Sequence, residues 1–334
     1  MADFDLFNGD ADGIFSLLQL RQVEPRPHAS LVTGVKRDTQ LFERIAQDVN
    51  SEDRICALDI GMSRNTPALR HVLKAGADVF FCDHHATGDI PESEHLTIIA
   101  DDTPETCTAY LIDQYLDGAK AAWAICGAYG DNFQALAGRI AANREIAFPL
   151  NQLRELGELV NYNAYGSTVE DLHFHPSELY RILSAYPDPM AFLEDKPKAL
   201  DILREGYRSD WEIAEQTREI DISNAGQILS LPASPASNRI SGLFANALVD
   251  EDPDIAFAIL THLDPDIGGY RVSIRAPISR RTKPADEFAK LYGGGGRAEA
   301  AGIDHLRDDE IDTCLLYTSP SPRDQRGSRM PSSA

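Results

Sequence analysis

The stretch Val79-Phe80-Phe81-Cys82-Asp83-His84-His85 determines how the rest of this sequence is interpreted. Its first four residues are apolar and lie between two glycines, a pattern that predicts a short buried β-strand. The strand ends in one carboxylate and two imidazoles. Because neighbouring side chains of an extended backbone point to opposite faces, we expect one histidine to bind a metal and the other to face a substrate. Taken alone, the triplet is more typical of a strand end with ordinary hydrogen-bonded histidines.

Strands and helices alternate over residues 3–100. The predicted strands are 3–8, 30–35, 54–58, 79–82 and 96–100. Their spacing of roughly 25 residues, with helical segments between them, predicts an α/β fold with a doubly wound parallel sheet. In such sheets ligands bind at the carboxyl ends of the strands. Polar residues stand at three of these ends, namely Asp10 and Asp12, Asp59, and the Asp83-His84-His85 triplet.

Helical patterns follow the predicted sheet, and a second group of strands follows the helices. The helical part contains Gly130-Asp131-Asn132, and residues 197–220 are expected to form one long connecting helix. Beyond it, short apolar runs at 227–231, 256–260 and 270–274, together with a short helix, predict a second, smaller α/β domain.

These patterns divide the chain into four parts. We expect a first domain over 1–195, a linker helix within 196–224 and a second domain over 225–313. Residues 314–334 are rich in Ser, Pro and Arg and show no periodicity. They resemble a translated adapter sequence, so we treat them as a non-native tail and exclude them from the fold prediction.

The 334-residue sequence is strongly acidic, with a formal net charge of −22. Non-specific binding to long nucleic acids depends on many Lys and Arg contacts with phosphates, so a surface that follows a long duplex is not expected. Small phosphate esters are compatible with this charge if divalent cations and a few local bases reverse the field in one cleft. The 5 cysteines have no zinc-type spacing, and no apolar run reaches the length of a membrane span, so we expect a cytoplasmic protein.

The hexapeptide Asn8-Gly9-Asp10-Ala11-Asp12-Gly13 has several interpretations when it is considered alone. It matches the opening of a calcium loop, although that loop requires Glu where this sequence has Gln19. It also resembles the strand-end Asp-x-Asp of haloacid-dehalogenase phosphatases, in which the first Asp is a nucleophile. The two aspartates could instead be a pair of metal ligands, and the turn could be an Asx-turn without a function.

The polar residues together resemble a known family. The order Asp10, Asp12, Asp59, Asp83-His84-His85 and Asp131 follows the motifs of the DHH phosphoesterase superfamily. This superfamily includes RecJ-type exonucleases, nanoRNases, cyclic-dinucleotide phosphodiesterases and family II inorganic pyrophosphatases. In the second domain, Ser273-Ile274-Arg275, Gly293-Gly294-Gly295-Gly296-Arg297 and Ala300-Ala301-Gly302 look like the DHH-associated C-terminal domain that holds the substrate.

This resemblance implies a centre with two metal ions. Asp59 would bridge the ions, and Asp10 would bind one of them. The ligands implied for the other ion are Asp12, His84 and Asp131. His85 would face the scissile phosphate, while Asp83 would orient a histidine. Two cations roughly 4 Å apart can activate a bridging water and hold the attacking and leaving oxygens. Mixed imidazole and carboxylate ligation favours Mn(II), with Co(II), Fe(II) or Mg(II) as alternatives.

Two positions depart from the family pattern. The family often has His or Asp shortly before the first Asp pair, where this sequence has Leu6 and Asn8. Asn is a poorer ligand, so we expect the first metal site to be weak or completed by water. The glycine motif usually ends in His, and here it ends in Arg297. Arginine grips oxyanions bidentately but does not act as a proton donor.

Substrate-binding residues are expected mainly in the second domain. The resemblance assigns this role to Arg275, to the glycines 293–296 and to Arg297, whose guanidinium and backbone N–H groups suit a phosphate. In the first domain, Lys36 and Arg37 follow the second predicted strand and are candidate phosphate contacts. A solvated pair is the favoured interpretation of these two residues.

The sequence therefore predicts a cytoplasmic phosphoesterase with two Mn(II) ions. The expected substrates are short oligonucleotides or small nucleotide phosphoesters, held between the two domains. A long duplex and a membrane are not expected partners, and the oligomeric state is open, with a homodimer as one option. One alternative is a single-metal aspartyl-phosphate phosphatase built on Asp10 and Asp12. The other is a catalytically silent nucleotide sensor, which Asn8 and Arg297 suggest.

Overall fold

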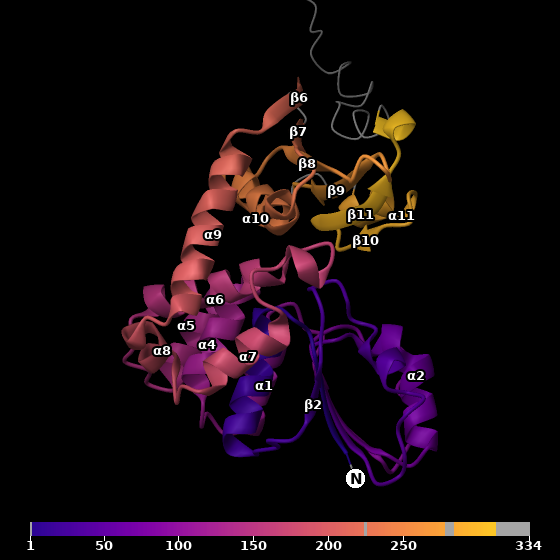
Figure 1. Ribbon diagram of the computed structural model, residues 1–334, viewed down its shortest axis with the longest axis vertical. Helices are drawn as coiled ribbons and strands as arrows, with labels where there is room; N and C mark the ends of the chain where they lie inside the picture. Colours follow the sequence, from indigo (N-terminus) through magenta and orange to yellow (C-terminus); the bar gives the residue numbers. More distant parts are fainter. Residues whose placement is uncertain (1, 224–225, 278–283, 312–334) are drawn as a thin grey trace, which may run out of the picture. The chain divides into compact units, whose positions relative to one another are not determined.

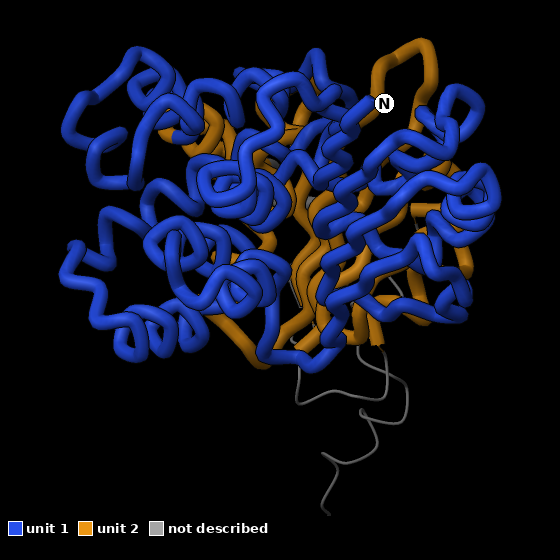
Figure 2. The backbone as a smooth tube through the Cα atoms, turned by 90° about the horizontal axis from the view of Figure 1, so that it is seen from below, with its two compact units in different colours: residues 1–207 blue, residues 208–334 orange. Residues whose placement is uncertain are grey.

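A computed structural model of the chain describes residues 2–223, 226–277 and 284–311. The chain divides into two compact units, residues 1–207 and 208–334, which Figure 2 shows in different colours. The predicted non-native tail, 314–334, lies outside the described residues. Among the described residues, no helix has both the length and the apolar character needed to cross a membrane.

The first unit is built on a five-stranded sheet with the order β2-β1-β3-β4-β5, and all neighbouring strands are parallel. The strands are β1 (Asp3–Phe7), β2 (Ser30–Val32), β3 (Arg54–Leu58), β4 (Asp78–Asp83) and β5 (Leu96–Ala100). Phe7 pairs with Leu58, and Leu58 pairs with Cys82, so β1, β3 and β4 reach the same edge of the sheet. The doubly wound parallel sheet predicted from the sequence is confirmed.

Helices cover both faces of this sheet (Figure 1). On one face, Leu6, Ala57 and Phe81 belong to a core that includes residues of the 3₁₀ helix η1 (Leu41–Arg44) and of α2 (Met62–Lys74). On the other face, Phe7, Leu58 and Cys82 belong to a larger core shared with α1 (Ala11–Val23) and the later helices. Adjacent residues of a strand therefore point into different cores, as expected for a sheet that is covered on both faces.

The larger core is filled by a layer of helices in which the chain segments approach closely. Its elements are α3 (Thr108–Tyr115), α4 (Ala121–Gly130), α5 (Gln134–Asn143), α6 (Leu150–Ala164), η2 (Val169–Asp171), α7 (Pro176–Ser184) and α8 (Pro189–Asp195). Every residue of α4 is buried, as expected for a helix that is apolar on all sides. A Cβ atom on Gly130 would lie 2.3 Å from the Cβ of Ala11 and 2.7 Å from the carbonyl oxygen of Gly157. Glycine at 130 therefore permits α4 to pack directly against α1 and α6.

The chain passes from the first unit to the second within α9 (Lys198–Glu215). The connecting helix predicted over 197–220 is too long, because Arg218–Ser223 form strand β6 instead of its last turn. From Glu219 onward the sequence Glu-Ile-Asp-Ile-Ser alternates polar and apolar residues, a period of two that favours a strand.

The second unit contains a six-stranded mixed sheet with the order β10-β11-β9-β8-β7-β6. After β6, its elements are β7 (Gly226–Leu231), α10 (Pro235–Glu251), β8 (Ala256–His262), β9 (Tyr270–Arg275), α11 (Ala285–Lys290), β10 (Gly295–Gly296), β11 (Ala300–Leu306) and η3 (Asp308–Glu310). Only the β7–β8 pair is parallel among the pairs described. The predicted second, smaller α/β part of the fold is confirmed, with more strands than the sequence indicated.

Candidate metal centre

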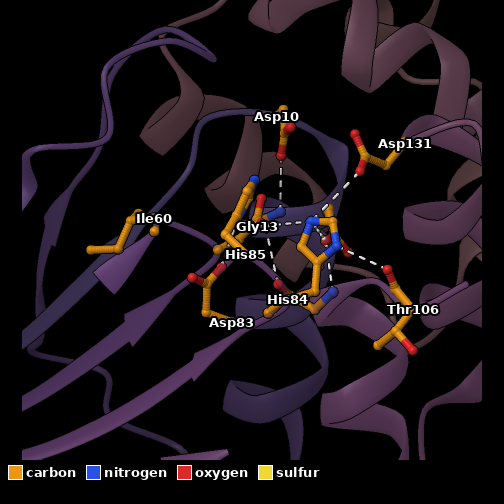
Figure 3. Close-up of polar contacts among 12 residues, drawn as sticks. Asp10, Gly13, Ile60, Asp83, His84, His85, Thr106 and Asp131 are labelled. Carbon is orange, nitrogen blue, oxygen red and sulfur yellow. Dashed lines mark hydrogen bonds and ion pairs between the residues drawn. The ribbon is translucent and has the colours of Figure 1, made fainter. Parts of the chain in front are cut away.

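The carboxyl edge of the first sheet gathers the polar residues that were predicted to act together (Figure 3). Asp10 follows β1 and caps α1, since its Oδ1 accepts a hydrogen bond of 3.0 Å from the backbone N–H of Gly13. Asp59 directly follows β3 with a left-handed backbone, φ 61°, a conformation that Asp tolerates. Asp83 is the last residue of β4, and Asp131 follows the end of α4. The hexapeptide is no calcium loop, because its third residue already caps a helix.

His84 lies at the centre of this group and is buried. Its Nδ1 donates a hydrogen bond of 2.8 Å to the carbonyl oxygen of Thr106, so the neutral ring has an unprotonated Nε2. That Nε2 lies 3.5 Å from Oδ1 of Asp59, 3.8 Å from Oδ2 of Asp12 and 3.8 Å from Oδ2 of Asp131. Figure 3 shows the ring joined to Thr106 on one side and to Asp131 on the other.

An unprotonated nitrogen that faces three carboxylates fits a cation bound among them. The ligand atoms of Asp12, His84 and Asp131 lie within 4.8 Å of one another, and so do those of Asp59, His84 and His85. Metal–ligand bonds of about 2.0–2.3 Å hold neighbouring ligands roughly 3–4.5 Å apart, so small movements would let these atoms share one ion. The donor set, one imidazole with carboxylates, suits a divalent transition metal. The residues present therefore fit one divalent cation beside Nε2 of His84.

Asp12 and Asp59 carry charges that no Lys or Arg of the described residues balances. Both are buried; Asp12 accepts hydrogen bonds of 2.7 Å from the backbone N–H groups of Thr108 and Ala109, and Asp59 accepts one of 3.0 Å from Oγ1 of Thr108. Burial raises the pKa of each carboxyl, and neighbouring carboxylates raise it further; His84 acts in the opposite direction on the pKa of Asp12 but is outweighed. Among the described residues, neither pairs with a Lys or Arg. A cation next to His84 would offset this excess negative charge.

His85 stands on the more open side of the group, with 41% of its side chain exposed. Its Nδ1 donates a hydrogen bond of 2.8 Å to Oδ1 of Asp83. Burial alone would lower the pKa of His85, but the hydrogen bond and the charge of Asp83 outweigh it and raise the pKa. The rings of His84 and His85 lie 4.4 Å apart between centroids, so the expectation that they point to opposite faces is wrong. The strand ends at Asp83, and its alternation does not extend to the two histidines.

Lys36 belongs to the site, which contradicts its interpretation as half of a solvated pair. Its Nζ lies 2.6 Å from Oδ2 of Asp10, 2.8 Å from Oδ1 of Asp131 and 3.2 Å from Oδ1 of Asn161. Burial would lower the pKa of Lys36, yet the charges of Asp10 and Asp131 raise it well above its usual value. Burial would raise the pKa of Asp131, but the same ammonium group, together with His84, outweighs it and lowers that pKa. The neighbouring Arg37 is exposed.

The two residues before the first Asp pair do not add charge to the site. Leu6 is buried in the core beneath α2. Asn8 is buried as well, and its backbone N–H donates a hydrogen bond of 3.2 Å to the carbonyl oxygen of Leu58. Its side-chain Oδ1 has no hydrogen-bond partner in the described part of the chain. Its assignment as a weak ligand or supporting residue stays a prediction.

The predicted substrate-binding residues lie in the second unit. The guanidinium group of Arg275 donates hydrogen bonds to Oδ1 of Asn246 and to the carbonyl oxygens of Ile274 and Gly242, at 2.7–3.1 Å, so it holds this unit together. The last two residues of the glycine run, 293–296, form the short strand β10, which pairs with β11. Arg297 is exposed in the turn that follows. The assignment of these residues to substrate binding stays a prediction.

Sequence reasoning missed the groups that hold the site residues in place. They are the carbonyl of Thr106, the hydroxyl and N–H of Thr108, the N–H of Ala109 and the amide of Asn161. One signal was present in the sequence. The helix that begins at Thr108 has Cys107 at its N-cap position, a residue that cannot cap it, so another side chain had to do so.

No protein-family model matches the sequence, and no curated protein sequence matches it. The structure does resemble solved proteins. A DHH-domain protein described as a member of a family of ribosomal proteins is 11% identical, with a TM-score of 0.63, and the match covers 95% of this chain and 85% of that one. The exonuclease RecJ bound to manganese is 16% identical, with a TM-score of 0.60 and coverage of 99% and 91%.

A third similar structure is the pGpG-specific phosphodiesterase PggH from Vibrio cholerae. It is 14% identical, with a TM-score of 0.53 and coverage of 95% of this chain and 98% of that chain. Identities this low establish the fold and leave the substrate open. The three matches, the parallel sheet and the Asp-His-His strand end agree. The chain therefore has a RecJ-like fold, which it shares with a DHH-domain protein and with PggH.

Proposed function

We propose that the chain is a metal-dependent phosphoesterase that hydrolyses short oligonucleotides or small nucleotide phosphoesters. The observation that carries this proposal is the buried Nε2 of His84, which faces the carboxylates of Asp12, Asp59 and Asp131 within 3.8 Å. The similarity to a manganese-bound exonuclease and to a pGpG-specific phosphodiesterase supports it. Mn(II) is the proposed ion because the donor set mixes nitrogen and oxygen.

The side chains around the cation site suit hydrolysis of a phosphate ester. A divalent cation bound there would supply Lewis-acid polarisation of a phosphoryl oxygen and a lower pKa for water. The carbonyl of Thr106 fixes the His84 tautomer that offers Nε2 to a cation. Asp83 holds His85 by its Nδ1, so Nε2 of His85 stays available to a substrate. With its raised pKa, His85 can donate a proton or a hydrogen bond to a phosphate oxygen near neutral pH.

The acidic composition and the second unit support a small substrate. A chain with a net charge of −22 can neutralise only a few phosphates, so affinity should gain little beyond the first few nucleotides. We propose that the second unit contributes to substrate binding through the exposed Arg297. Localisation in the cytoplasm is likewise part of this proposal.

The alternative of an aspartyl-phosphate phosphatase has weaker support. Its nucleophile would be Asp10, which is buried. One oxygen of Asp10 accepts the N–H of Gly13, and the other is paired with Lys36. These donors withdraw electron density from both oxygens, which makes Asp10 a poorer nucleophile than a free carboxylate.

The test is a hydrolysis screen in Mn(II) and in chelator. The substrates are oligonucleotides from two nucleotides upward, cyclic dinucleotides, 3′-phosphoadenosine 5′-phosphate and pyrophosphate. We expect chelator-sensitive hydrolysis of substrates of about two to five nucleotides or of a small phosphoester. Asp59→Asn should abolish it, whereas Asp102→Asn, an exposed aspartate beyond β5, should leave it unchanged. A trapped phosphoenzyme would favour the aspartyl mechanism, and tight binding without turnover would favour a sensor. Efficiency that rises steadily with strand length would favour a processive exonuclease.

A further inference from the structure

We propose that this site binds one divalent cation, and that the ammonium group of Lys36 takes the place of the second cation that the family resemblance implies. The inference rests on the proposed function, because it concerns how the same site neutralises a phosphate ester. Three observations on the residues of the first unit carry it.

The first observation is that the Lys36 ammonium group is fully engaged. It has three N–H donors, and three acceptors lie within hydrogen-bond distance: Oδ2 of Asp10 at 2.6 Å, Oδ1 of Asp131 at 2.8 Å and Oδ1 of Asn161 at 3.2 Å. Asp10 and Asp131 follow strand β1 and helix α4, which are far apart in the sequence. The ammonium group thus joins carboxylates from separate elements, as a bound cation does.

The backbone around Lys36 keeps it there. Its own N–H donates a hydrogen bond of 2.9 Å to the carbonyl oxygen of Ala164, at the end of α6. Val35, the preceding residue, is buried, and the ring of Tyr165 lies 5.6 Å from Nζ. An exposed lysine samples many rotamers, whereas this side chain is only 27% exposed and is tied at both ends. Its position is therefore part of the fold.

The second observation is that both oxygens of Asp10 already accept a hydrogen bond, one of them from the Lys36 ammonium group. Its Oδ1 caps α1 through the N–H of Gly13, and its Oδ2 pairs with Lys36. A dication on Oδ2 would lie within a few ångströms of the ammonium charge and would have to displace it. Asp10 belongs to neither group of described residues whose ligand atoms cluster closely enough for a metal. The ion that the resemblance assigns to Asp10 does not fit this arrangement.

The third observation is that the two halves of the site differ in charge balance. Asp12 and Asp59, beside Nε2 of His84, have no Lys or Arg partner among the described residues, so a cation bound beside that nitrogen would offset their charge. Asp10 is already paired with Lys36. Asp131 links the two halves, since its Oδ1 contacts Lys36 and its Oδ2 lies 3.8 Å from His84. Asp131 therefore takes the bridging position that the resemblance gave to Asp59.

An ammonium group in this place changes what the site can do. It can neutralise negative charge through space, but its three N–H donors are already taken by protein oxygens, and it cannot coordinate and activate water as a metal does. Its charge is present at any metal concentration. The site should therefore need only a single ion to reach its working state, and occupancy should rise with Mn(II) as a simple one-site curve.

The test counts bound ions and does not depend on turnover. The purified chain is titrated with Mn(II), and bound and free Mn(II) are measured by equilibrium dialysis and by electron paramagnetic resonance. We expect one Mn(II) per chain, without the signal of two exchange-coupled ions. In Lys36→Met, Asp10 and Asp131 lose their ammonium partner, and the count should rise to two. Lys36→Arg retains a positive charge and should still bind one, as should Arg37→Met, which changes an exposed neighbour.

The outcomes separate this inference from the proposed function. Two Mn(II) ions in the unaltered chain would overturn the inference and leave the phosphoesterase proposal standing; this measurement needs no variant, so it holds if Lys36→Met does not fold. A count that stays at one in a folded Lys36→Met would also overturn it. One bound Mn(II) without hydrolysis of any substrate would support the inference of a single cation and overturn the proposed phosphoesterase activity. Absence of binding would overturn both.

Discussion

Replacing Asp59 by Asn should stabilise the metal-free protein while removing its metal response. Asp59 is buried, and its ionised form is disfavoured by burial and by Asp12, Asp10, Asp83 and Asp131, which together raise its pKa well above 3.8. Asn has nearly the same shape, tolerates the same left-handed backbone and keeps an oxygen for the hydroxyl of Thr108. The variant therefore removes a charge and little else.

The size of the effect follows from the distances in the site. Oxygens of Asp59 and Asp12 lie 3.5 Å and 3.8 Å from the same nitrogen of His84, so these two carboxylates are close neighbours. Two unit charges about 7 Å apart repel by on the order of 2 kcal/mol at an effective dielectric constant of about 20. For a unit of this size that corresponds to a rise of about 4–8 °C in Tm. Conversely, Mn(II) at about 1,000 times its Kd should stabilise the unaltered protein by about 4 kcal/mol.

Thermal melts at pH 8 in chelator and in Mn(II) test this reasoning. In chelator, Asp59→Asn should melt above the unaltered protein; in Mn(II), the order should reverse, because only the unaltered protein retains all the ligands. The pH dependence has a definite sign. Ionisation of Asp59 carries no penalty below its ordinary pKa of 3.8, and the penalty grows until the pH reaches the raised folded value, so the gap in chelator should close on acidification. A variant that melts below the unaltered protein in chelator, or that gains equally from Mn(II), would refute the reasoning.

Three further predictions concern packing, acid stability and substrate binding. Gly130→Ala should lower the free energy of unfolding, measured in a urea melt, by about 1–3 kcal/mol or more, because the new Cβ would overlap α1 and α6. The control Gly138→Ala, whose Cβ would meet nothing within 4 Å, should be neutral or slightly stabilising. Asp53→Asn should lower the free energy of unfolding by about 1 kcal/mol at pH 7. Burial would raise the pKa of Asp53, but three N–H groups that bond its carboxylate outweigh burial and lower that pKa. The difference in stability between the variant and the unaltered protein should disappear as the pH falls through the lowered pKa, below 3.8. Arg297→Ala should raise KM by roughly 10- to 100-fold with little change in kcat, and an unchanged KM would remove Arg297 from substrate binding.

The sheet and the meeting of its strand ends could be predicted from local patterns. Apolar runs of strand length alternate with helical segments, which leaves few arrangements other than a parallel sheet. Once the strands are parallel, Asp10, Asp59 and Asp83 must share an edge, because each follows or ends a strand. That part of the site depends only on the direction of neighbouring strands, and the sequence carries this information.

The role of Lys36 depends on information that the local pattern lacks. It follows β2, which pairs with β1, and this neighbour relation places Lys36 beside Asp10. Asn161, which completes its coordination, comes from a helix more than a hundred residues later in the chain. A Lys-Arg pair looks solvated when each residue is judged by its own hydrophilicity. The error about the two histidines is of a different kind, because the alternation rule was applied beyond the last residue of a strand.

The dependence of the site on α3 and α4 has a consequence for the order of events during synthesis. Asp12 takes its hydrogen-bond donors from residues 96 and 97 positions later, and Lys36 reaches Asp131 across 95 positions. A ribosome that adds about 5–20 residues per second has produced all five strands roughly 1.5–6 s before α4 is complete. Until α3 is made, Asp12 lacks its donors, and until α4 is complete, Lys36 lacks one of its two carboxylates. A nascent chain therefore acquires its full capacity to capture a cation late, after α3 and α4 have packed against a sheet whose strands were made earlier.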